Sequence, residues 1–360
     1  MKIGVNARLL SQPYTGIGQY TINLFRRMAE MSPGDEFTLV TNGKTEESFP
    51  PNVKIKIIPE KKWMLIGGLR KGFWEQFQVP KFFKKNKFDI IHFTYPAYPL
   101  RGLGTKSVIT IHDMIQFTDS RYSKKIRSKI YFWLVRKSLS KSVANPDVKF
   151  IGVSEATTAE FKRFFPSAKI ETIHEGASEE FLRPVSAKTG LKQPYLLYVG
   201  GYDPRKNTQY LLEVFSHIQK DIPEMKLVLA GRLPKDIARG TLNILKTGAV
   251  NEEELNTLYK EAEAFINLSE NEGFNLPVLE AAYAGTPIII SDIPVHRELY
   301  GQHGLLVQKN NAQEASRKIL ELLNDKTKLE KMRKETAFLR SKYTWEKSSK
   351  KTYQLYLKSL

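Results

Sequence analysis

Short apolar runs alternate with amphipathic stretches from one end of the chain to the other. The runs are rich in β-branched residues and are bounded by turn residues or by helical spacing, which is typical of strands in βαβ units. Such alternation predicts parallel sheets. In the first half of the chain the runs lie at 2–5, 37–40, 53–58, 89–93, 107–111 and 149–153. In the second half they lie at 195–200, 226–231, 264–269, 287–291 and 304–307.

A looser, proline-containing stretch at 181–194 separates the two series of runs. We therefore predict two doubly wound, Rossmann-like α/β domains, at 1–184 and 185–342. The pattern after Leu306 is helical to the end of the chain, and a last helix is expected at 343–360. Because doubly wound sheets bind ligands at the carboxyl ends of their strands, the residues that follow the runs are candidates for a site.

The composition excludes several kinds of protein. The 360 residues include no cysteine, so neither a disulfide framework nor a thiolate metal site can form. This composition fits a reducing compartment. The N-terminus reads as a strand without the apolar core of a signal peptide, and no apolar run reaches the ~18 residues that span a bilayer. We therefore expect a cytoplasmic protein whose membrane contact, if any, is peripheral.

The formal net charge of +18 is larger in the first half of the chain, above all between Lys81 and Lys141. A field of this sign attracts polyanions, either nucleic acid or a membrane rich in anionic lipid. Alternatively, the positive charge only keeps the protein soluble and binds no partner. The charge does not by itself decide among these three interpretations.

An acidic segment, NEGFNLPVLEAAYAG, follows the run at 264–269. Pro277 suits the first position of a helix and Gly285 suits the residue beyond its end, so a helix is predicted between them. Glu272 then lies on a strand-to-helix loop, and Glu280 lies in the first turn of the helix. A carboxylate there can accept hydrogen bonds from two hydroxyls, such as those of a ribose. The helix dipole is an alternative explanation for Glu280.

The longer segment NEGFNLPVLEAAYAGTPIIISDIP resembles the signature of glycosyltransferase family 4, and the resemblance extends over nearly all of the chain. The two glutamates of the signature stand eight positions apart, at Glu272 and Glu280. The resemblance implies that Glu272 contacts hydroxyls of the donor sugar and that Glu280 binds the ribose of the nucleotide. Asn275 replaces the usual glycine, which points to a different sugar pocket. The other donor-binding positions that the resemblance implies are Gly273, Phe274 and Leu276.

A cationic turn with the sequence GYDPRKN follows the run at 195–200. Adjacent cations at a strand end can neutralise a diphosphate leaving group as its charge develops, and the alternative is an exposed basic turn without a ligand. Lys206 matches a lysine of the family. Gly201 stands where the family usually has arginine, and Arg205 is expected to supply the missing charge.

A short glycine-containing segment, Gly16-Ile17-Gly18, lies between the first run and a helical pattern that starts near Gln19. Such a loop at a helix N-terminus can hold phosphate, although the third glycine of a dinucleotide fingerprint is absent. The family has a similar loop, commonly with two successive glycines. Thr15 replaces the first of these and Gly16 retains the second, so we assign Gly16 to donor binding.

Two further candidates follow strands of the predicted first domain. His112 ends the run at 107–111, and the resemblance implies that it faces the donor sugar, while a structural role is the alternative. Asp113 either orients the ring of His112 or caps the loop. Ser154 follows the run at 149–153 and matches a family position near the donor, with a helix N-cap as the alternative.

No metal ion or other cofactor is predicted. A metal-dependent nucleotide-sugar site is expected to show two aspartates one residue apart, and the sequence contains no such pair and no spacing of metal ligands. Arg205, Lys206 and backbone N–H groups are expected to stabilise the leaving group instead. The family retains the anomeric configuration, and the resemblance implies a front-face path in which the departing phosphate deprotonates the acceptor. A double displacement on a carboxylate nucleophile stays open.

Two basic segments with apolar residues lie in the predicted first domain, at 121–143 and 61–74. In the first, apolar residues recur at helical spacing, at Ile126, at Ile130, at Trp133 or Leu134, and at a later position. Such segments bind an anionic bilayer, at ~1 kcal/mol per basic residue, or pack as core helices with a solvated basic face. In the family the first domain binds the acceptor, and a lipid-linked glycan would explain the basic excess there.

The resemblance implies a GT-B fold, in which two domains face a central cleft and the C-terminal helix packs on the first domain. The predicted activity is retaining transfer of a hexose or deoxyhexose from a nucleotide sugar to a lipid-linked or other saccharide acceptor, at the inner face of the cell membrane. Its role would be the assembly of cell-surface polysaccharide or glycolipid. A nucleotide-sugar epimerase of the same architecture is one alternative. A nucleic-acid-binding protein is another, supported by charge alone, and no nucleic-acid partner is expected because no binding motif is visible.

Overall fold

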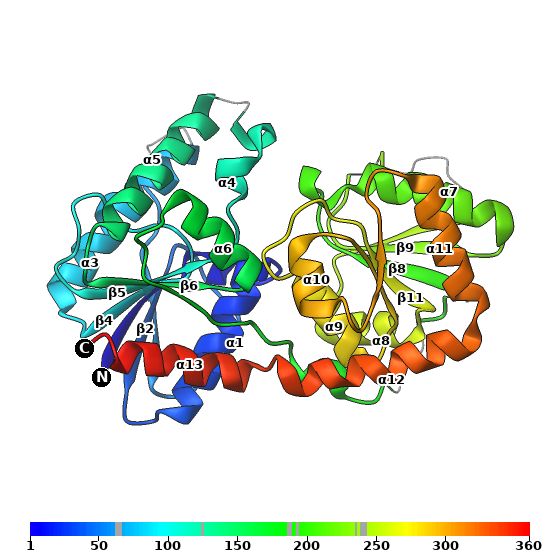
Figure 1. Cartoon of the computed structure of the whole chain (residues 1–360). Helices are drawn as coiled ribbons and strands as arrows, with labels where there is room; N and C mark the ends of the chain where they lie inside the picture. The colour runs from blue at the N-terminus through cyan, green and yellow to red at the C-terminus, as the bar shows by residue number, and fades with distance from the viewer. Residues whose placement is uncertain (62–66, 124–125, 186–188, 192–193, 235, 238–242) are drawn as a thin grey trace. The chain divides into compact units, whose positions relative to one another are not determined.

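The computed structural model describes residues 1–360 apart from 62–66, 124–125, 186–188, 192–193, 235 and 238–242 (Figure 1). The chain divides into two compact units. Unit 1 comprises Met1–Glu175 together with Trp345–Leu360, and unit 2 comprises Gly176–Thr344. The chain therefore leaves unit 1, builds unit 2 and returns to unit 1 at its C-terminal end.

Unit 1 is built on a parallel sheet. In its described part seven strands follow the order β3-β2-β1-β4-β5-β6-β7, and this order reverses between β1 and β4. The strands are β1 (Lys2–Asn6), β2 (Glu36–Thr41), β3 (Val53–Ile57), β4 (Ile90–Phe93), β5 (Lys106–Ile111), β6 (Val148–Gly152) and β7 (Ile170–Thr172).

The helices of unit 1 include one from the far end of the chain. Helix α13 lies alongside α1 (Figure 1), where the Ser349 hydroxyl donates to the carbonyl oxygen of Leu24 at 3.0 Å. Tyr353 donates to a carboxylate oxygen of Asp35 at 2.6 Å. The C-terminal helix thus packs on the first domain. The helices of the unit are α1 (Gly16–Met31), α2 (Gly67–Phe73), α3 (Val79–Asn86), α4 (Ile115–Thr118), α5 (Ile126–Val143), α6 (Glu155–Phe164) and α13 (Trp345–Leu357).

Unit 2 repeats the same architecture with fewer strands. In its described part six parallel strands follow the order β10-β9-β8-β11-β12-β13, which reverses between β8 and β11. The strands are β8 (Tyr195–Val199), β9 (Lys226–Ala230), β10 (Ile244–Gly248), β11 (Ala264–Asn267), β12 (Ile288–Ser291) and β13 (Leu305–Val307). The helices are α7 (Thr208–Asp221), α8 (Glu252–Glu261), α9 (Leu276–Ala284), α10 (Pro294–Tyr300), α11 (Ala312–Asn324) and α12 (Lys326–Lys342).

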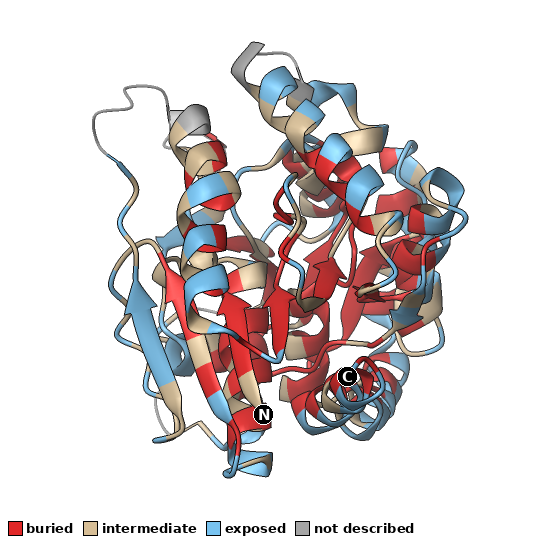
Figure 2. Cartoon of the chain, turned by 90° about the vertical axis from the view of Figure 1, so that its left-hand side faces the viewer, coloured by how far each residue is buried: buried red, intermediate tan, exposed pale blue. Residues whose placement is uncertain are grey.

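The central strands of each sheet are buried, and the edge strands are not. Strands β4 and β11 read IIHF and AFIN, and every one of their residues is buried. Mainly apolar strands that are buried at every residue are typical of parallel sheets that helices cover on both faces. The edge strands β3 and β10 are exposed along most of their length. Figure 2 shows this contrast in unit 1, with red central strands beside a pale blue edge strand.

The division between the units falls after Glu175, earlier than the boundary after residue 184 that the sequence predicts. The segment in question belongs to unit 2 because α8 binds it. Asn256 of α8 donates from its amide nitrogen to the carbonyl oxygens of Glu180 and Arg183, at 2.8 and 3.1 Å. These backbone groups are therefore satisfied within unit 2.

Candidate functional site

The loops that follow β8 and β11 meet in unit 2. These strands are neighbours at the point where the strand order reverses, which is where doubly wound sheets bind ligands. A backbone hydrogen bond of 2.7 Å from Glu270 N to the carbonyl oxygen of Arg205 joins the two loops. The topology therefore brings together the cationic turn, residues 201–207, and the glutamate loop, residues 269–275.

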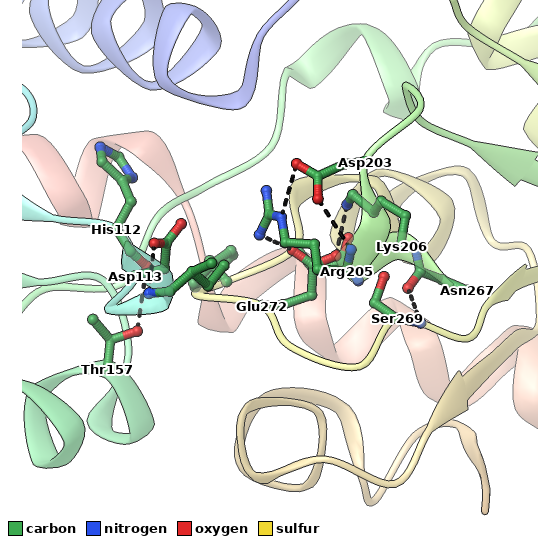
Figure 3. Close-up of polar contacts among 12 residues, drawn as sticks. His112, Asp113, Thr157, Asp203, Arg205, Lys206, Asn267, Ser269 and Glu272 are labelled. Atoms are coloured by element: carbon green, nitrogen blue, oxygen red, sulfur yellow. Dashed lines mark hydrogen bonds and ion pairs between the residues drawn. The ribbon is translucent and has the colours of Figure 1, made fainter. Parts of the chain in front are cut away.

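Two cations of the cationic turn pair with one buried carboxylate (Figure 3). Arg205 Nη1 lies 2.9 Å from Oε2 of Glu272, and Lys206 Nζ lies 2.6 Å from Oε1. Asp203 begins the short helical turn that presents both cations, because its carboxylate accepts from Arg205 N at 3.1 Å. Asn207, in the left-handed conformation with φ of 51°, ends this turn and leads into α7. The three charged groups that the sequence assigns to this site are thus in direct contact.

The carboxyl group of Glu272 stays ionised although it is buried. Burial raises its pKa, but the charges of Lys206 and Arg205 outweigh burial and hold the pKa at about 2. The ion pairs also hold both cations in one place before any ligand binds. An anionic ligand would therefore meet cations that need little rearrangement, which is how a site stabilises charge that develops during a reaction.

The start of α9 continues the glutamate loop. Gly273, Phe274 and Leu276 are buried there. Asn275 precedes the helix with φ of 72° and ψ of 65°, in the left-handed region. Glycine enters this region at the lowest cost, and asparagine is among the few other residues that adopt it readily. Asn275 therefore keeps the backbone shape that suits the glycine usual at this position in the family.

Glu280 lies in the second turn of α9, not in the first turn that the sequence predicts, because the helix begins at Leu276. The helix dipole acts mainly within the first turn and so does not explain this carboxylate. Tyr259 of α8 donates to Oε2 of Glu280 at 2.9 Å. Burial, together with the nearby charge of Glu252, raises the pKa of Glu280 to about 7. Its contact with a ribose stays a prediction.

Arg205 and Lys206 place two cations at these strand ends of unit 2, where a phosphate group would find its counter-charge. Among the residues that the structure describes, no three His, Asp or Glu side chains cluster as metal ligands. The site thus has the chemistry of a pocket for an anion with hydroxyl groups, where cations face the anion and carboxylates face the hydroxyls.

Gly16 of unit 1 begins α1, so the helix starts earlier than the pattern near Gln19 predicts. Thr15 caps the helix by accepting from Gly18 N at 3.1 Å. Packing requires the glycine at Gly18, where a Cβ atom would lie 2.5 Å from the carbonyl oxygen of Gln12. A Cβ atom at Gly16 would meet no described atom within 4 Å. Packing therefore does not explain Gly16, and its role in donor binding stays a prediction.

His112 directly follows β5, and oxygen atoms hold both of its ring nitrogens. Nδ1 lies 3.0 Å from Oε1 of Glu175, and Nε2 lies 2.9 Å from the carbonyl oxygen of Thr94. The ring of Tyr20, from α1, packs edge to face against the imidazole with centroids 4.8 Å apart. Glu175 therefore orients the ring within unit 1. Contact between His112 and a sugar stays a prediction.

Asp113 and Ser154 take the capping roles that the sequence offers as alternatives. A carboxylate oxygen of Asp113 accepts from Ile115 N at 3.1 Å. Ser154 is buried and caps α6, because its hydroxyl accepts from Thr157 N at 3.1 Å. The Thr157 hydroxyl in turn donates to the carbonyl oxygen of His112 at 3.4 Å. Ser154 and His112 thus lie at the carboxyl ends of the adjacent strands β6 and β5, and Thr157 contacts both. Contact of Ser154 with a donor stays a prediction.

Sequence reasoning does not identify three residues that hold the site residues in place. Glu175 follows β7, an edge strand of sequence IET, which is too short and too polar to be predicted as a strand. Tyr259 lies within α8, and His296 lies within α10, where it contacts Asn275. A rule that selects residues after strands does not find residues within helices. The sequence signal that could have led to His296 is the segment SDIPVHREL, which contains it and overlaps the end of the family signature.

Known proteins match this chain along most of its length. Residues 14–181 match the family described as Glycosyltransferase Family 4, and residues 181–337 match the family described as Glycosyl transferases group 1. A relative along the whole chain is O-antigen chain mannosyltransferase B of Escherichia coli. It is 27% identical, and the match covers 99% of this chain and 99% of the relative.

Solved structures of low sequence identity share the fold. WaaG, a glycosyltransferase involved in lipopolysaccharide biosynthesis, superimposes with a TM-score of 0.81 at 13% identity, over 99% of this chain and 99% of its own. HepE of Anabaena, in complex with UDP and glucose, gives a TM-score of 0.76 at 13% identity, over 100% and 99% of the two chains. The architecture of two parallel-sheet α/β domains is therefore the GT-B fold.

Proposed function

Because the chain belongs to glycosyltransferase family 4, we propose that it transfers a hexose or deoxyhexose from a nucleotide sugar to a lipid-linked glycan, with retention of the anomeric configuration. The Escherichia coli relative is by name a mannosyltransferase of O-antigen chains, which supports a hexose donor and a role in polysaccharide assembly. The Anabaena structure contains UDP and glucose, which supports a nucleotide-sugar donor.

The observation that carries the proposal is the pairing of Arg205 and Lys206 with Glu272. In the proposed reaction the bond between the anomeric carbon and a diphosphate oxygen breaks, and a bond to the acceptor oxygen forms on the same face of the sugar. The acceptor proton passes to an oxygen of the departing phosphate. Arg205 and Lys206 bind the negative charge that develops on the diphosphate, and Glu272 accepts hydrogen bonds from sugar hydroxyls. We propose that these cations act without a metal ion.

Helix α5 supports a membrane-associated acceptor. Its inner side chains, such as Val135 and Leu139, are buried, so the core-packed interpretation holds for one side of the helix. Its outer side exposes 55% of Trp133 and 46% of Ile130 beside exposed basic residues such as Lys137. Exposed apolar side chains among cations suit the surface of an anionic bilayer. No helix in the described part of the chain could cross a bilayer, and we propose peripheral contact at the cytoplasmic face of the membrane.

The other basic segment, 61–74, gives this idea less support. Its residues 62–66 lie outside the described part of the chain. Trp74 at its end is fully buried, and its indole N–H donates to the carbonyl oxygen of Ile58 at 2.6 Å. Trp74 is therefore a core residue and does not offer its ring to a bilayer.

The proposal is tested by incubating the purified chain with GDP-mannose or UDP-glucose and a short-chain lipid-linked saccharide. We expect nucleoside diphosphate to be released when the acceptor is present, and the product to show the anomeric configuration of the donor by NMR. An inverted product would contradict retention. Loss of activity in EDTA that Mn²⁺ restores would contradict the metal-free proposal.

Two outcomes of the same experiment would favour the alternative functions. Conversion of the donor to its epimer without transfer would indicate an epimerase. Tight, salt-sensitive binding to duplex DNA, with no binding of a nucleoside diphosphate, would indicate a nucleic-acid-binding protein.

A further inference from the structure

Helix α10 holds the end of the glutamate loop through two buried side chains. Asn275 donates from Nδ2 to Nε2 of His296 at 2.9 Å. Tyr300 donates its hydroxyl to the carbonyl oxygen of Phe274 at 3.0 Å, and their two rings pack edge to face. The last two residues of the loop are thus tied to one helix just before α9 begins.

The start of the glutamate loop is joined to the same histidine through β12. Ser291, the last residue of β12, donates its hydroxyl to the carbonyl oxygen of Ser269. His296 Nδ1 lies 2.9 Å from the carbonyl oxygen of Ser291 and 3.3 Å from its hydroxyl. His296 therefore contacts residues that hold both ends of the loop, and Glu272 lies between those ends.

The partners of His296 determine which of its nitrogens carries the proton. A carbonyl oxygen only accepts, so Nδ1 carries the proton and donates to Ser291. Nε2 is then an acceptor, and this requires the atom of Asn275 that faces it to be the amide nitrogen. Burial lowers the pKa of His296 to about 4, so the ring is neutral near pH 7. The carbonyl Oδ1 of Asn275 is buried and has no hydrogen-bond partner among the described residues.

We propose that His296 is a positioning residue for Glu272: by holding Asn275 in its left-handed conformation, it keeps the glutamate loop in the shape that binds the sugar of the donor. The inference rests on the proposed function, which assigns donor binding to this loop. The backbone conformation of Asn275 has a cost that glycine avoids, and the hydrogen bond to His296 offsets that cost. A side-chain contact thus stabilises here a conformation that glycine adopts without help.

The interaction predicts how two substitutions combine. In His296→Ala, Nδ2 of the buried Asn275 amide loses its partner, so neither polar atom of the amide is satisfied, and the loop should leave its conformation. In Asn275→Gly, the backbone keeps its conformation but His296 Nε2 is left without a donor. In the double variant no amide remains to be satisfied, and glycine adopts the left-handed conformation by itself. The double variant should therefore bind donor better than His296→Ala alone.

The test is a double-mutant cycle on ligand affinity, measured by titration calorimetry with GDP-mannose and UDP-glucose and with GDP and UDP. We expect His296→Ala to lower the affinity for the intact donor about tenfold, and Asn275→Gly to lower it about threefold. Because the two residues are coupled, the affinity of the double variant should equal that of Asn275→Gly. The diphosphates should be affected less, because Glu272 is expected to contact the sugar. A general loss of folding would instead weaken both kinds of ligand together.

Two more variants keep the test decisive if His296→Ala folds poorly. Tyr300→Phe removes only the hydroxyl that donates to Phe274, and it should lower the affinity for the intact donor about threefold. The matched control is His92→Ala, which truncates another fully buried histidine, in unit 1. It should lower the melting temperature and leave the affinity for the donor unchanged.

The failures of the two proposals are distinguishable. If the unmodified protein binds none of the four ligands, the proposed function is wrong. If it binds a donor and His296→Ala binds that donor equally well, the function stands and His296 does not position the loop. A double variant whose loss equals the product of the two single losses also overturns the inference, because it would show that the residues act independently.

Discussion

Glu272 and its two cations show how one carboxylate can organise a site at the scale of single residues. Arg205 and Lys206 each contact a different oxygen of Glu272, so removal of either cation leaves the other pair in place. Removal of the carboxylate would instead take this anion from Lys206 and leave Arg205 with the carboxylate of Asp203, 3.5 Å away. Such an unpaired charge is costly where water is excluded. Substitution of a cation is therefore the clearer test of function.

We expect Lys206→Ala to lower transfer about 10²–10³-fold, as loss of one charge-stabilising donor does in other enzymes. The fold should persist because Arg205 still pairs with Glu272. Release of nucleoside diphosphate measures the first effect, and thermal unfolding measures the second. Lys326→Ala removes an exposed lysine of the same unit and should leave turnover unchanged. Full turnover in Lys206→Ala would remove this lysine from the site.

Glu280 should make nucleotide affinity depend on pH. Its pKa lies at about 7 against an ordinary value of 4.5, and the ionised form is the stronger acceptor for the two hydroxyls of a ribose. Affinity for GDP or UDP should therefore rise between about pH 6 and 8, and Glu280→Gln should remove this rise. Calorimetric titration at several pH values measures both. If the affinity of Glu280→Gln rises with pH as much as that of the unmodified protein, another group is responsible for the titration.

The same carboxyl also affects stability, with the opposite dependence on pH. The folded protein binds the proton of Glu280 more tightly than the unfolded chain, because its folded pKa is raised. Its contribution to stability is therefore full below about pH 4.5 and is lost as the pH rises through 7. Tight nucleotide binding and maximal stability thus make opposite demands on this side chain.

At the scale of elements, apolar runs in the sequence made the buried strands predictable. The position of Glu272 was predictable as well, because it follows one of these strands. Strands β11 and β12 are apolar up to their last residues, Asn267 and Ser291, and the loop after β11 carries Glu272. Strands β7 and β10 were not predictable in this way, because charged and polar residues interrupt edge strands that solvent reaches. The contact of His296 with Asn275 was also hidden, because spacing along one helix does not specify the loop that it faces.

The exposed side of α5 should contribute to membrane binding. Trp133→Ala and Lys137→Ala should each weaken binding to vesicles that contain anionic phospholipid, the lysine variant about fivefold, which corresponds to ~1 kcal/mol per cation at a bilayer surface. Sedimentation with vesicles measures the change. Phe338→Ala removes an exposed aromatic ring from α12 and should have no effect. Equal binding to neutral vesicles would contradict an electrostatic attraction.

At the scale of the whole molecule, unit 1 depends on the last residues of the chain. Tyr356 of α13 is fully buried and contacts His92 of β4, and Ser349 is fully buried against α1. Burial of each large apolar side chain contributes ~1.5–3 kcal/mol. The sum over α13 approaches the ~5–15 kcal/mol that stabilises an entire domain.

A chain that ends at Thr344 should therefore keep unit 2 folded and lose the fold of unit 1. Amide hydrogen exchange followed by mass spectrometry should show lost protection in β1 and β4 and retained protection in β8 and β11. A chain that ends at Leu357 keeps α13 and serves as the control. Normal protection of β1 in the shorter chain would show that unit 1 is complete without α13.

The return of the chain to unit 1 also affects biosynthesis. Unit 2 is continuous in sequence and can fold as soon as Thr344 has left the ribosome, whereas unit 1 waits for the final helix although its first strand is made first. The domain translated first is thus the last to be completed. A message cut short before α13 would yield a finished unit 2 attached to an unfinished unit 1, which quality-control proteases can recognise. The position of α13 therefore makes a complete unit 1 depend on translation through Leu357.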